Sequence, residues 1–84
     1  MNIVFAPQAW ADYQHWRSAD RTVLARINHL IVDACRSPFE GIGKPEPLQY
    51  GLPGAWSRRI TGDYRLVYRV IGDDLQIIQT RYHH

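Results

Sequence analysis

The sequence has a single cysteine, no long apolar run and no large excess of charge. The lone Cys35 rules out a disulfide within the chain. No stretch resembles a signal peptide or a membrane-spanning helix, so we expect a cytoplasmic protein that does not contact membranes. Internal repeats and low-complexity tails are also missing. A chain of 84 residues can form one hydrophobic core but not two, which predicts one domain over residues 1–84.

The net charge of +2 is small but unevenly distributed. Residues 1–40 carry four arginines and four acidic residues, whereas residues 41–84 carry six basic and four acidic residues. An autonomous nucleic-acid binder depends on many Lys and Arg contacts to phosphates. The chain lacks that excess, so an RNA substrate would have to be presented by another molecule.

The first half of the chain predicts one strand and two helices. Residues 2–5 form a short, β-branched apolar run, which we expect to be a strand buried in a sheet. Pro7 suits the first turn of a helix over residues 8–18. In that helix the aromatic residues recur every three positions, at Trp10, Tyr13 and Trp16, and we expect them to line the core.

Asp20 is a predicted N-cap for a second helix, which ends at Ser37-Pro38. The connection between the helices is so short that they should form an antiparallel hairpin against one face of a sheet. Cys35 lies on the apolar stripe of the second helix, with no basic residue or histidine placed to activate it. We therefore expect an inert, buried thiol. The stripe comprises Val23, Leu24, Ile27, Leu30, Ile31, Ala34 and Cys35.

The last third of the chain predicts a hairpin followed by a returning strand. Two alternating runs flank Gly62-Asp63, where the glycine can supply the positive φ of a tight turn. The whole chain is therefore an α+β fold, with a two-helix hairpin on one face of a small, mainly antiparallel, twisted sheet. Strand alternation predicts that the helices cover Leu66, Tyr68, Val70 and Ile78.

The same alternation predicts which polar side chains face away from the helices. Arg65 and His83 should share this open face, although a one-residue bulge would reverse individual assignments. Arg58 and Arg59 must point in opposite directions. We expect Arg59 to contact phosphate and Arg58 to have a structural partner.

Residues 38–54 predict a shaped loop, since four prolines and four glycines interrupt any regular element. Lys44 and Glu46 flank Pro45, and prolines restrict the backbone around both. A rigid backbone reduces the entropy lost when a polar side chain must point at one place. Two interpretations of Glu46 remain open here: a functional carboxylate, or a surface partner for an arginine.

Five segments of the chain carry a resemblance to a known family. They are Trp10-Ala-Asp-Tyr13 with Trp16, Pro38-Phe-Glu-Gly-Ile-Gly-Lys-Pro-Glu-Pro-Leu48, Trp56-Ser-Arg-Arg-Ile60, Arg65-Leu-Val-Tyr68 and Arg81-Tyr-His83. Together they resemble the YoeB toxins of bacterial toxin-antitoxin pairs, within the RelE superfamily. The proline-framed loop combined with the terminal Arg-Tyr-His is the specific part, and the resemblance spans the whole chain.

The resemblance implies a RelE-like, microbial-ribonuclease-like fold and a ribosome-dependent endonuclease that cuts mRNA in the ribosomal A site and inhibits translation. The family's catalytic Glu, Arg and His fall on Glu46, Arg65 and His83. The chain departs from the family at His84, where the family ends in Tyr, and at Gln49, where a close relative carries Lys. The implied partners are a cognate YefM-like antitoxin, the ribosome with its mRNA, a second copy of the chain, and operator DNA through the antitoxin complex.

The chemistry can also be argued from the residue types. Attack of a 2′-hydroxyl on the adjacent phosphate needs a base, a cation for the phosphoryl oxygens and an acid for the leaving 5′ oxygen. Glu46, Arg65 and His83 suit these roles, with Lys44, Arg59 and His84 as substrate contacts. We expect no cofactor and no metal, since adjacent strand residues such as His83 and His84 point to opposite faces.

Two functions of another class remain as alternatives. A ParE-like gyrase poison would act by binding protein without nuclease residues, and the presence of Glu46, Arg65 and His83 argues against it. A silent co-repressor that only binds its antitoxin would follow if the loss of the family's terminal Tyr had abolished cleavage. Growth on induction would discriminate between an active toxin and a silent one.

Overall fold

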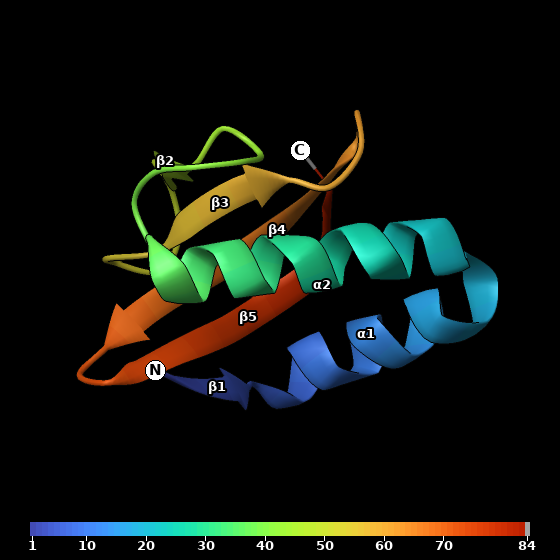
Figure 1. Cartoon of the computed structure of the whole chain (residues 1–84), viewed down its shortest axis with the longest axis horizontal. Helices are drawn as coiled ribbons and strands as arrows, with labels where there is room; N and C mark the ends of the chain where they lie inside the picture. The colour runs from blue at the N-terminus through green and yellow to red at the C-terminus, as the bar shows by residue number, and fades with distance from the viewer. Residues whose placement is uncertain (84) are drawn as a thin grey trace.

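The computed structural model describes residues 1–83 and contains a five-stranded sheet with both helices on one face (Figure 1). The order across the sheet is β1-β5-β4-β3-β2. β1 runs parallel to β5, and the other neighbours are antiparallel. The predicted α+β fold is confirmed. The elements are β1 (Asn2–Phe5), α1 (Pro7–Ala19), α2 (Arg21–Arg36), β2 (Glu46–Pro47), β3 (Trp56–Arg59), β4 (Tyr64–Ile71) and β5 (Asp74–His83).

The helix boundaries follow from local chemistry. Pro7 opens α1, where its fixed φ suits the first turn and its missing N–H is not needed. The carboxylate of Asp20 accepts hydrogen bonds from the backbone N–H groups of Thr22 and Val23, so the predicted N-cap is confirmed. Since only Asp20 separates the helices, they fold back as the expected hairpin (Figure 1). Neither helix within the described residues is long and apolar enough to cross a membrane.

The core lies between the two helices and the sheet. Leu66 and Tyr68 of β4 are buried, as predicted, but Leu75 and Ile77 fill the β5 positions in place of Ile78. Because Leu75 and Ile77 face the helices, ordinary strand alternation turns Ile78 to the other face. The Cys35 side chain is partly buried against the core. The buried apolar residues are Ala9, Trp16, Val23, Ile27, Leu30, Ile31, Ala34, Ile60, Leu66, Tyr68, Leu75 and Ile77.

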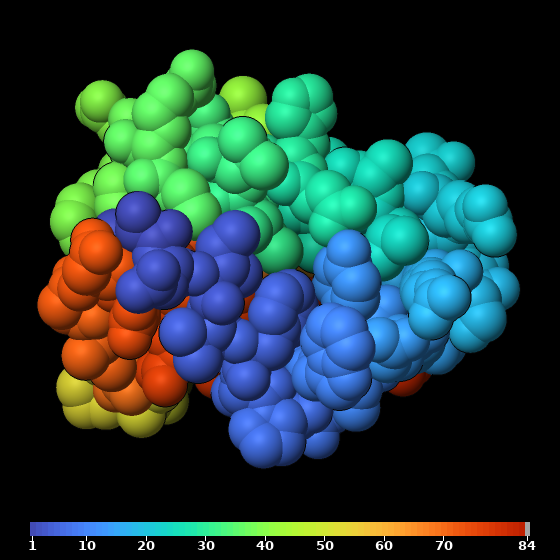
Figure 2. Space-filling model, turned by 60° about the horizontal axis from the view of Figure 1, so that its bottom comes forward, coloured from blue at the N-terminus to red at the C-terminus, as the bar shows by residue number. Residues whose placement is uncertain are grey.

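Two expectations about burial were wrong. β1 is an edge strand rather than a buried one, because its single neighbour is β5, and Ile3 and Val4 are exposed. Trp10 is 52% exposed, whereas Trp16 is buried. A three-residue spacing turns the side chain by about 60° around the helix at each step, so three such residues cannot all face the core. Figure 2 shows β1 and α1 in front, along one side of the molecule.

The β3–β4 turn also differs from the prediction. Gly62 does not take a positive φ, and the connection is longer than two residues, closing at the hydrogen bond from the Ile60 N–H to the Tyr64 carbonyl. The tight turn is instead between β4 and β5, where Ile71 pairs with Asp74 and Gly72 takes a φ of 58°. Glycine adopts this left-handed conformation without steric cost.

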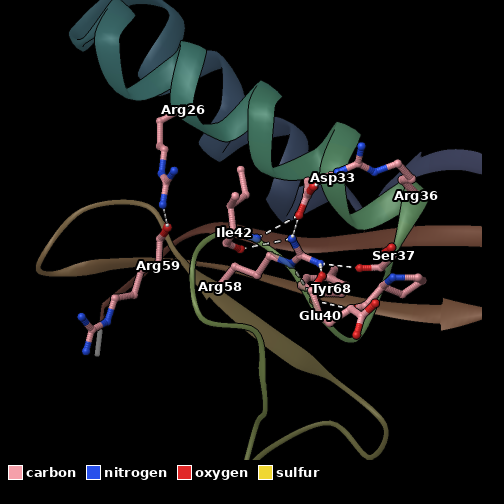
Figure 3. Close-up of polar contacts among 10 residues, drawn as sticks. Arg26, Asp33, Arg36, Ser37, Glu40, Ile42, Arg58, Arg59 and Tyr68 are labelled. Carbon is pink, nitrogen blue, oxygen red and sulfur yellow. Dashed lines mark hydrogen bonds and ion pairs between the residues drawn. The ribbon is translucent and has the colours of Figure 1, made fainter.

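Arg58 of β3 is completely buried and uses all five of its N–H groups (Figure 3). One N–H donates to the Asp33 carboxylate of α2 at 2.6 Å and another to the Tyr68 hydroxyl of β4 at 3.0 Å. The remaining three donate to backbone carbonyls of the loop that follows α2, those of Ser37, Glu40 and Ile42. The structural partner predicted for Arg58 is therefore confirmed.

Asp33 and Tyr68 complete this network. The hydrogen bond from Arg58, followed by that from the Ile42 N–H, lowers the pKa of Asp33 to about 2. Burial raises the pKa of Tyr68, which keeps its hydroxyl as a donor to the Pro38 carbonyl at 2.6 Å. Gly41 takes a φ of 118°, and any Cβ there would collide with the Asp33 carboxylate. The loop leading to Glu46 is thus anchored to the core through its backbone.

We expect Arg58→Met to lower the free energy of unfolding by about 3–5 kcal/mol, because it leaves the Asp33 carboxylate without its buried partner. Arg36→Ala is the matched control. Arg36 pairs with the same carboxylate but is 79% exposed, so its loss should cost less than about 1 kcal/mol. Urea unfolding at neutral pH measures both. Equal losses in the two variants would contradict a central role for Arg58.

The same pair predicts acid sensitivity. The folded-state pKa of Asp33 lies below its unfolded value of about 3.9, so the pair stabilises the fold fully above about pH 4. This contribution is lost as the pH falls from about 4 through 2. NMR titration of the Asp33 carboxyl carbon should give a midpoint near 2, and it should stay well below 3.9 in Arg36→Ala. A midpoint near 4 in the wild type would refute the assignment.

Candidate active site

Strand register brings a set of polar side chains together on the face of the sheet opposite the helices, the open face. Directly paired residues of neighbouring strands point to the same face. Leu66 and Tyr68 face the helices, so Arg65 and Val67 face the other way. Glu46 pairs with Ser57, which pairs with Val67, and Arg65 pairs with Arg59 on one side and Tyr82 on the other.

These side chains line a hollow of about 670 Å³. This volume falls within the range of about 300–1,000 Å³ typical of ligand sites. The walls combine charged, hydroxyl, apolar and aromatic groups, and they come from strands β2 to β5 and from the loop after β2. The lining residues are Glu46, Pro47, Leu48, Gln49, Tyr50, Ser57, Arg65 and Tyr82.

An ion pair occupies one side of the hollow. A guanidinium nitrogen of Arg65 lies 3.1 Å from the Glu46 carboxylate and donates a hydrogen bond of 3.3 Å to the Ser57 hydroxyl. The Arg65 side chain is 9% exposed, whereas that of Glu46 is 56% exposed. The arginine is therefore enclosed by the sheet, whereas the carboxylate is accessible to solvent. An anion that enters the hollow would compete with Glu46 for Arg65.

The other predicted basic contacts lie near the hollow but do not line it. Arg59 is exposed and pairs directly with Arg65 across β3 and β4. Figure 3 shows its side chain pointing away from the network around Arg58. Lys44 is exposed two residues before Glu46, in a left-handed turn with a φ of 51°. The carbonyl of its neighbour Gly43 accepts from the Arg59 N–H at 2.7 Å, which ties this turn to the end of β3.

The expectation that His83 shares the open face with Arg65 was wrong for this structure. His83 pairs with Tyr64, and the two rings are in edge contact with centroids 5.6 Å apart. Tyr64 in turn contacts Trp16 of α1, so His83 lies on the helix side of the sheet. The physical reason is that Leu75 and Ile77, rather than Ile78, face the helices, so alternation along β5 turns His83 to that side as well. His84 lies outside the described residues.

Sequence reasoning missed two residues of the hollow, Ser57 and Tyr82. Ser57 is buried and bonds to Arg65, but nothing in the sequence distinguishes it from a serine on an ordinary strand. Tyr82 pairs with Arg65 on the open face, where His83 was expected. The signal for Tyr82 was an aromatic ring within a basic terminal segment, and it was assigned to the wrong face because the alternation was counted from Ile78 instead of Ile77.

The arrangement has the parts of an acid-base site for an anionic substrate. It combines an exposed carboxylate, an enclosed guanidinium that can fork onto phosphate oxygens, and aromatic walls. Residues 1–83 contain no group of three or more His, Cys, Asp or Glu side chains placed to hold a metal ion.

Comparison with known proteins identifies relatives over the full chain. The sequence profile of the YoeB-like toxins of bacterial type II toxin-antitoxin systems matches residues 5–84. Toxin YoeB of Streptomyces coelicolor is 54% identical over 84 residues, covering all of both chains. The structure of the YoeB dimer from Staphylococcus aureus is 41% identical in sequence, with a TM-score of 0.93. The heterotetrameric YoeB-YefM complex from that organism is also 41% identical, with a TM-score of 0.89. Each match covers all of this chain and 98% of the other.

The resting ion pair leads to a prediction that needs no substrate. Glu46→Gln should bind inorganic phosphate about fivefold more tightly than the wild type, because the anion no longer competes with a carboxylate for Arg65. The factor corresponds to about 1 kcal/mol for a partly exposed ion pair. NMR titration of the Arg65 side chain measures it. Arg65→Gln should abolish phosphate binding both in the wild type and in Glu46→Gln. Unchanged phosphate affinity in Glu46→Gln would show that Glu46 does not compete with the anion for Arg65.

Proposed function

The chain belongs to the YoeB-like toxins of bacterial type II toxin-antitoxin systems, and from this premise we propose that it is an endoribonuclease that cleaves mRNA in the ribosomal A site. The observation that carries the proposal is the pair of Glu46 and Arg65, 3.1 Å apart in a hollow on the open face. A carboxylate base next to a phosphate-binding cation is what metal-independent cleavage of RNA requires.

The reaction assigns one role to each group. Phosphate binding to Arg65 releases Glu46, which takes the proton of the 2′-hydroxyl as its oxygen attacks phosphorus. The bond to the 5′ oxygen breaks, giving a 2′,3′-cyclic phosphate. Arg65 stabilises the charge on the phosphoryl oxygens, and it remains charged throughout.

His83 protonates the leaving 5′ oxygen in this proposal. In the free protein its ring lies beside Tyr64, on the helix side of the sheet. Because His83 is exposed and ends β5, a rotation of the chain end on substrate binding would bring the ring over the hollow. Lys44 and Arg59, exposed beside the site, contact flanking phosphates, and His84 contacts the substrate from the chain end.

The proposed partners follow from the family and from charge. The small net charge of +2 leaves the chain dependent on the ribosome to present mRNA. A YefM-like antitoxin inhibits the toxin by laying an acidic or amphipathic segment over the basic residues of the open face, and the complex binds operator DNA through the antitoxin. Two copies of the chain associate, as in the relative from Staphylococcus aureus whose structure is described as a dimer.

The test is cleavage-site mapping on one transcript, free and on programmed ribosomes. Wild type should cut only the ribosome-bound message, within the A-site codon. Glu46→Ala and His83→Ala should each lose about 10²- to 10⁴-fold in rate, the usual contribution of a general base or acid. Glu40→Ala is the matched control, since its exposed carboxylate lies in the same loop and only its backbone N–H and carbonyl form hydrogen bonds among residues 1–83.

Two results would overturn the proposal. Intact ribosome-bound mRNA with wild type would favour a silent co-repressor or a gyrase-directed toxin, and growth and gyrase supercoiling assays would separate these two. Full activity of Glu46→Ala would leave ribosome-dependent cleavage standing but remove the base from the mechanism.

A further inference from the structure

β5 gains residues relative to β4 at two places. Pairing shifts by one residue between the partners of Val67 and Tyr68, and again between those of Arg65 and Val67. In the second shift, β4 advances two residues while β5 advances three, from Gln79 to Tyr82. Each shift moves the pairing by one residue, so the second restores the match of faces seen before the first: Ile77 pairs with Tyr68, and His83 with Tyr64. The second bulge therefore places Tyr82, rather than Arg81, opposite Arg65.

Side chains of α1 hold the backbone of this bulge. The Thr80 N–H donates to the Asp12 carboxylate at 3.1 Å, and the Thr80 carbonyl accepts from the Trp16 indole N–H at 2.7 Å. β1 covers β5 only as far as Ile77, so α1 takes over where the neighbouring strand ends. The Thr80 hydroxyl is buried without a hydrogen-bond partner in the described part of the chain. The contacts from α1 are therefore to the backbone of the bulge.

Asp12 is a buried carboxylate outside the catalytic hollow. It is 5% exposed, and its second oxygen accepts a hydrogen bond from the Gln8 amide at 2.8 Å. Burying a carboxylate is unfavourable unless donors satisfy it. Here the donors are Gln8 on the same helix and the Thr80 N–H, 68 positions away in the chain. The hydrogen bond between Asp12 and the Thr80 N–H is the one that links α1 to β5.

Tyr82 presents an aromatic ring to the hollow. It is partly buried, and no hydrogen bond to its hydroxyl is found among residues 1–83. Around it lie Pro47, Leu48 and Tyr50, next to the Arg65 guanidinium. RNA-binding sites stack unpaired bases on aromatic rings beside the cations that hold phosphates. A ring on a strand is more rigid than Tyr50, which is 84% exposed on a loop.

We propose that Tyr82 stacks against a base of the substrate and that Asp12 is a positioning residue, which keeps Tyr82 in the hollow by fixing the backbone of Thr80 from the other side of the sheet. The substrate class rests on the proposed function. The position of the Tyr82 ring in the free protein is independent of the proposed function, because it follows from the structure alone.

Cleavage kinetics on programmed ribosomes test the stacking role. Tyr82→Ala should raise KM about tenfold with kcat within about twofold, because stacking of one base contributes roughly 5- to 150-fold to binding. Tyr82→Phe should behave as wild type, since the ring and not the hydroxyl is used. Wild-type KM in Tyr82→Ala, or equal losses in both variants, would overturn the stacking role.

A double-mutant cycle tests the positioning role. Asp12→Ala should raise KM as Tyr82→Ala does, and the double variant should be no worse than Tyr82→Ala alone. A variant that is merely less stable would lower the active fraction, and so kcat, and would add to the Tyr82 effect. Gln8→Ala is the matched control because it leaves the bond to Thr80 in place. Asp12→Asn, which retains an acceptor oxygen, should restore the wild-type KM.

NMR of the free protein separates failure of this inference from failure of the proposed function. Wild type and Asp12→Asn should show nuclear Overhauser effects between the Tyr82 ring and the Arg65 side chain, and Asp12→Ala should lose them. Unchanged effects in Asp12→Ala would overturn the positioning role. Titration with a purine ribonucleoside monophosphate should shift the Tyr82 ring signals in wild type; unshifted signals would overturn stacking even if wild type cut no mRNA.

Discussion

The ion pair between Arg58 and Asp33 is the interaction on which the rest of the structure depends. It joins β3 to α2 in the core, and the remaining N–H groups of Arg58 bind the Tyr68 hydroxyl and three carbonyls of the loop after α2. A buried charge persists only when its partners satisfy it fully. The hydrogen bonds from Arg58 to the loop carbonyls therefore fix the path of the loop. That path places Glu46 in β2, which pairs with β3.

The sheet separates structural from functional charge by the alternation of a single strand. Arg58 and Arg59 are adjacent, yet Arg58 is buried on the helix side of the sheet and Arg59 is exposed on the opposite face. The same division applies to Arg65 and Leu66 on β4. The packing of Arg58 and Leu66 in the core thus fixes the backbone of β3 and β4, and the same backbone carries Arg59 and Arg65 on the open face. The candidate site therefore has an enclosed cation, Arg65, beside an exposed carboxylate, Glu46.

The N-terminal elements β1 and α1 meet the C-terminal strand β5 along its length. β1 pairs with the first half of β5, and α1 holds the second half through Asp12 and Trp16. The solved toxins of the same family share this fold closely, with TM-scores of 0.93 and 0.89 for the two Staphylococcus aureus structures. In this chain the fold presents Glu46, Arg65 and Tyr82 together and leaves His83 beside Tyr64. The acid role proposed for His83 therefore requires movement of the chain end, whereas Glu46, Arg65 and Tyr82 already lie together in the hollow.

The sequence by itself determined the features that depend on neighbours along the chain. Apolar spacing and the Asp20 cap specify the two helices, their short connection specifies the hairpin, and alternation specifies which face of β4 the helices cover. The proline-framed loop and the terminal segment also identified the family and drew attention to Glu46 and Arg65. Only the tertiary structure decided the rest. The exposure of Trp10 and β1, the burial of Arg58 and the exchange of His83 for Tyr82 depend on contacts between distant residues. Packing against the helices decides that Leu75 and Ile77 face the core, and Asp12 holds the β5 bulge from 68 positions away; no local pattern records either contact.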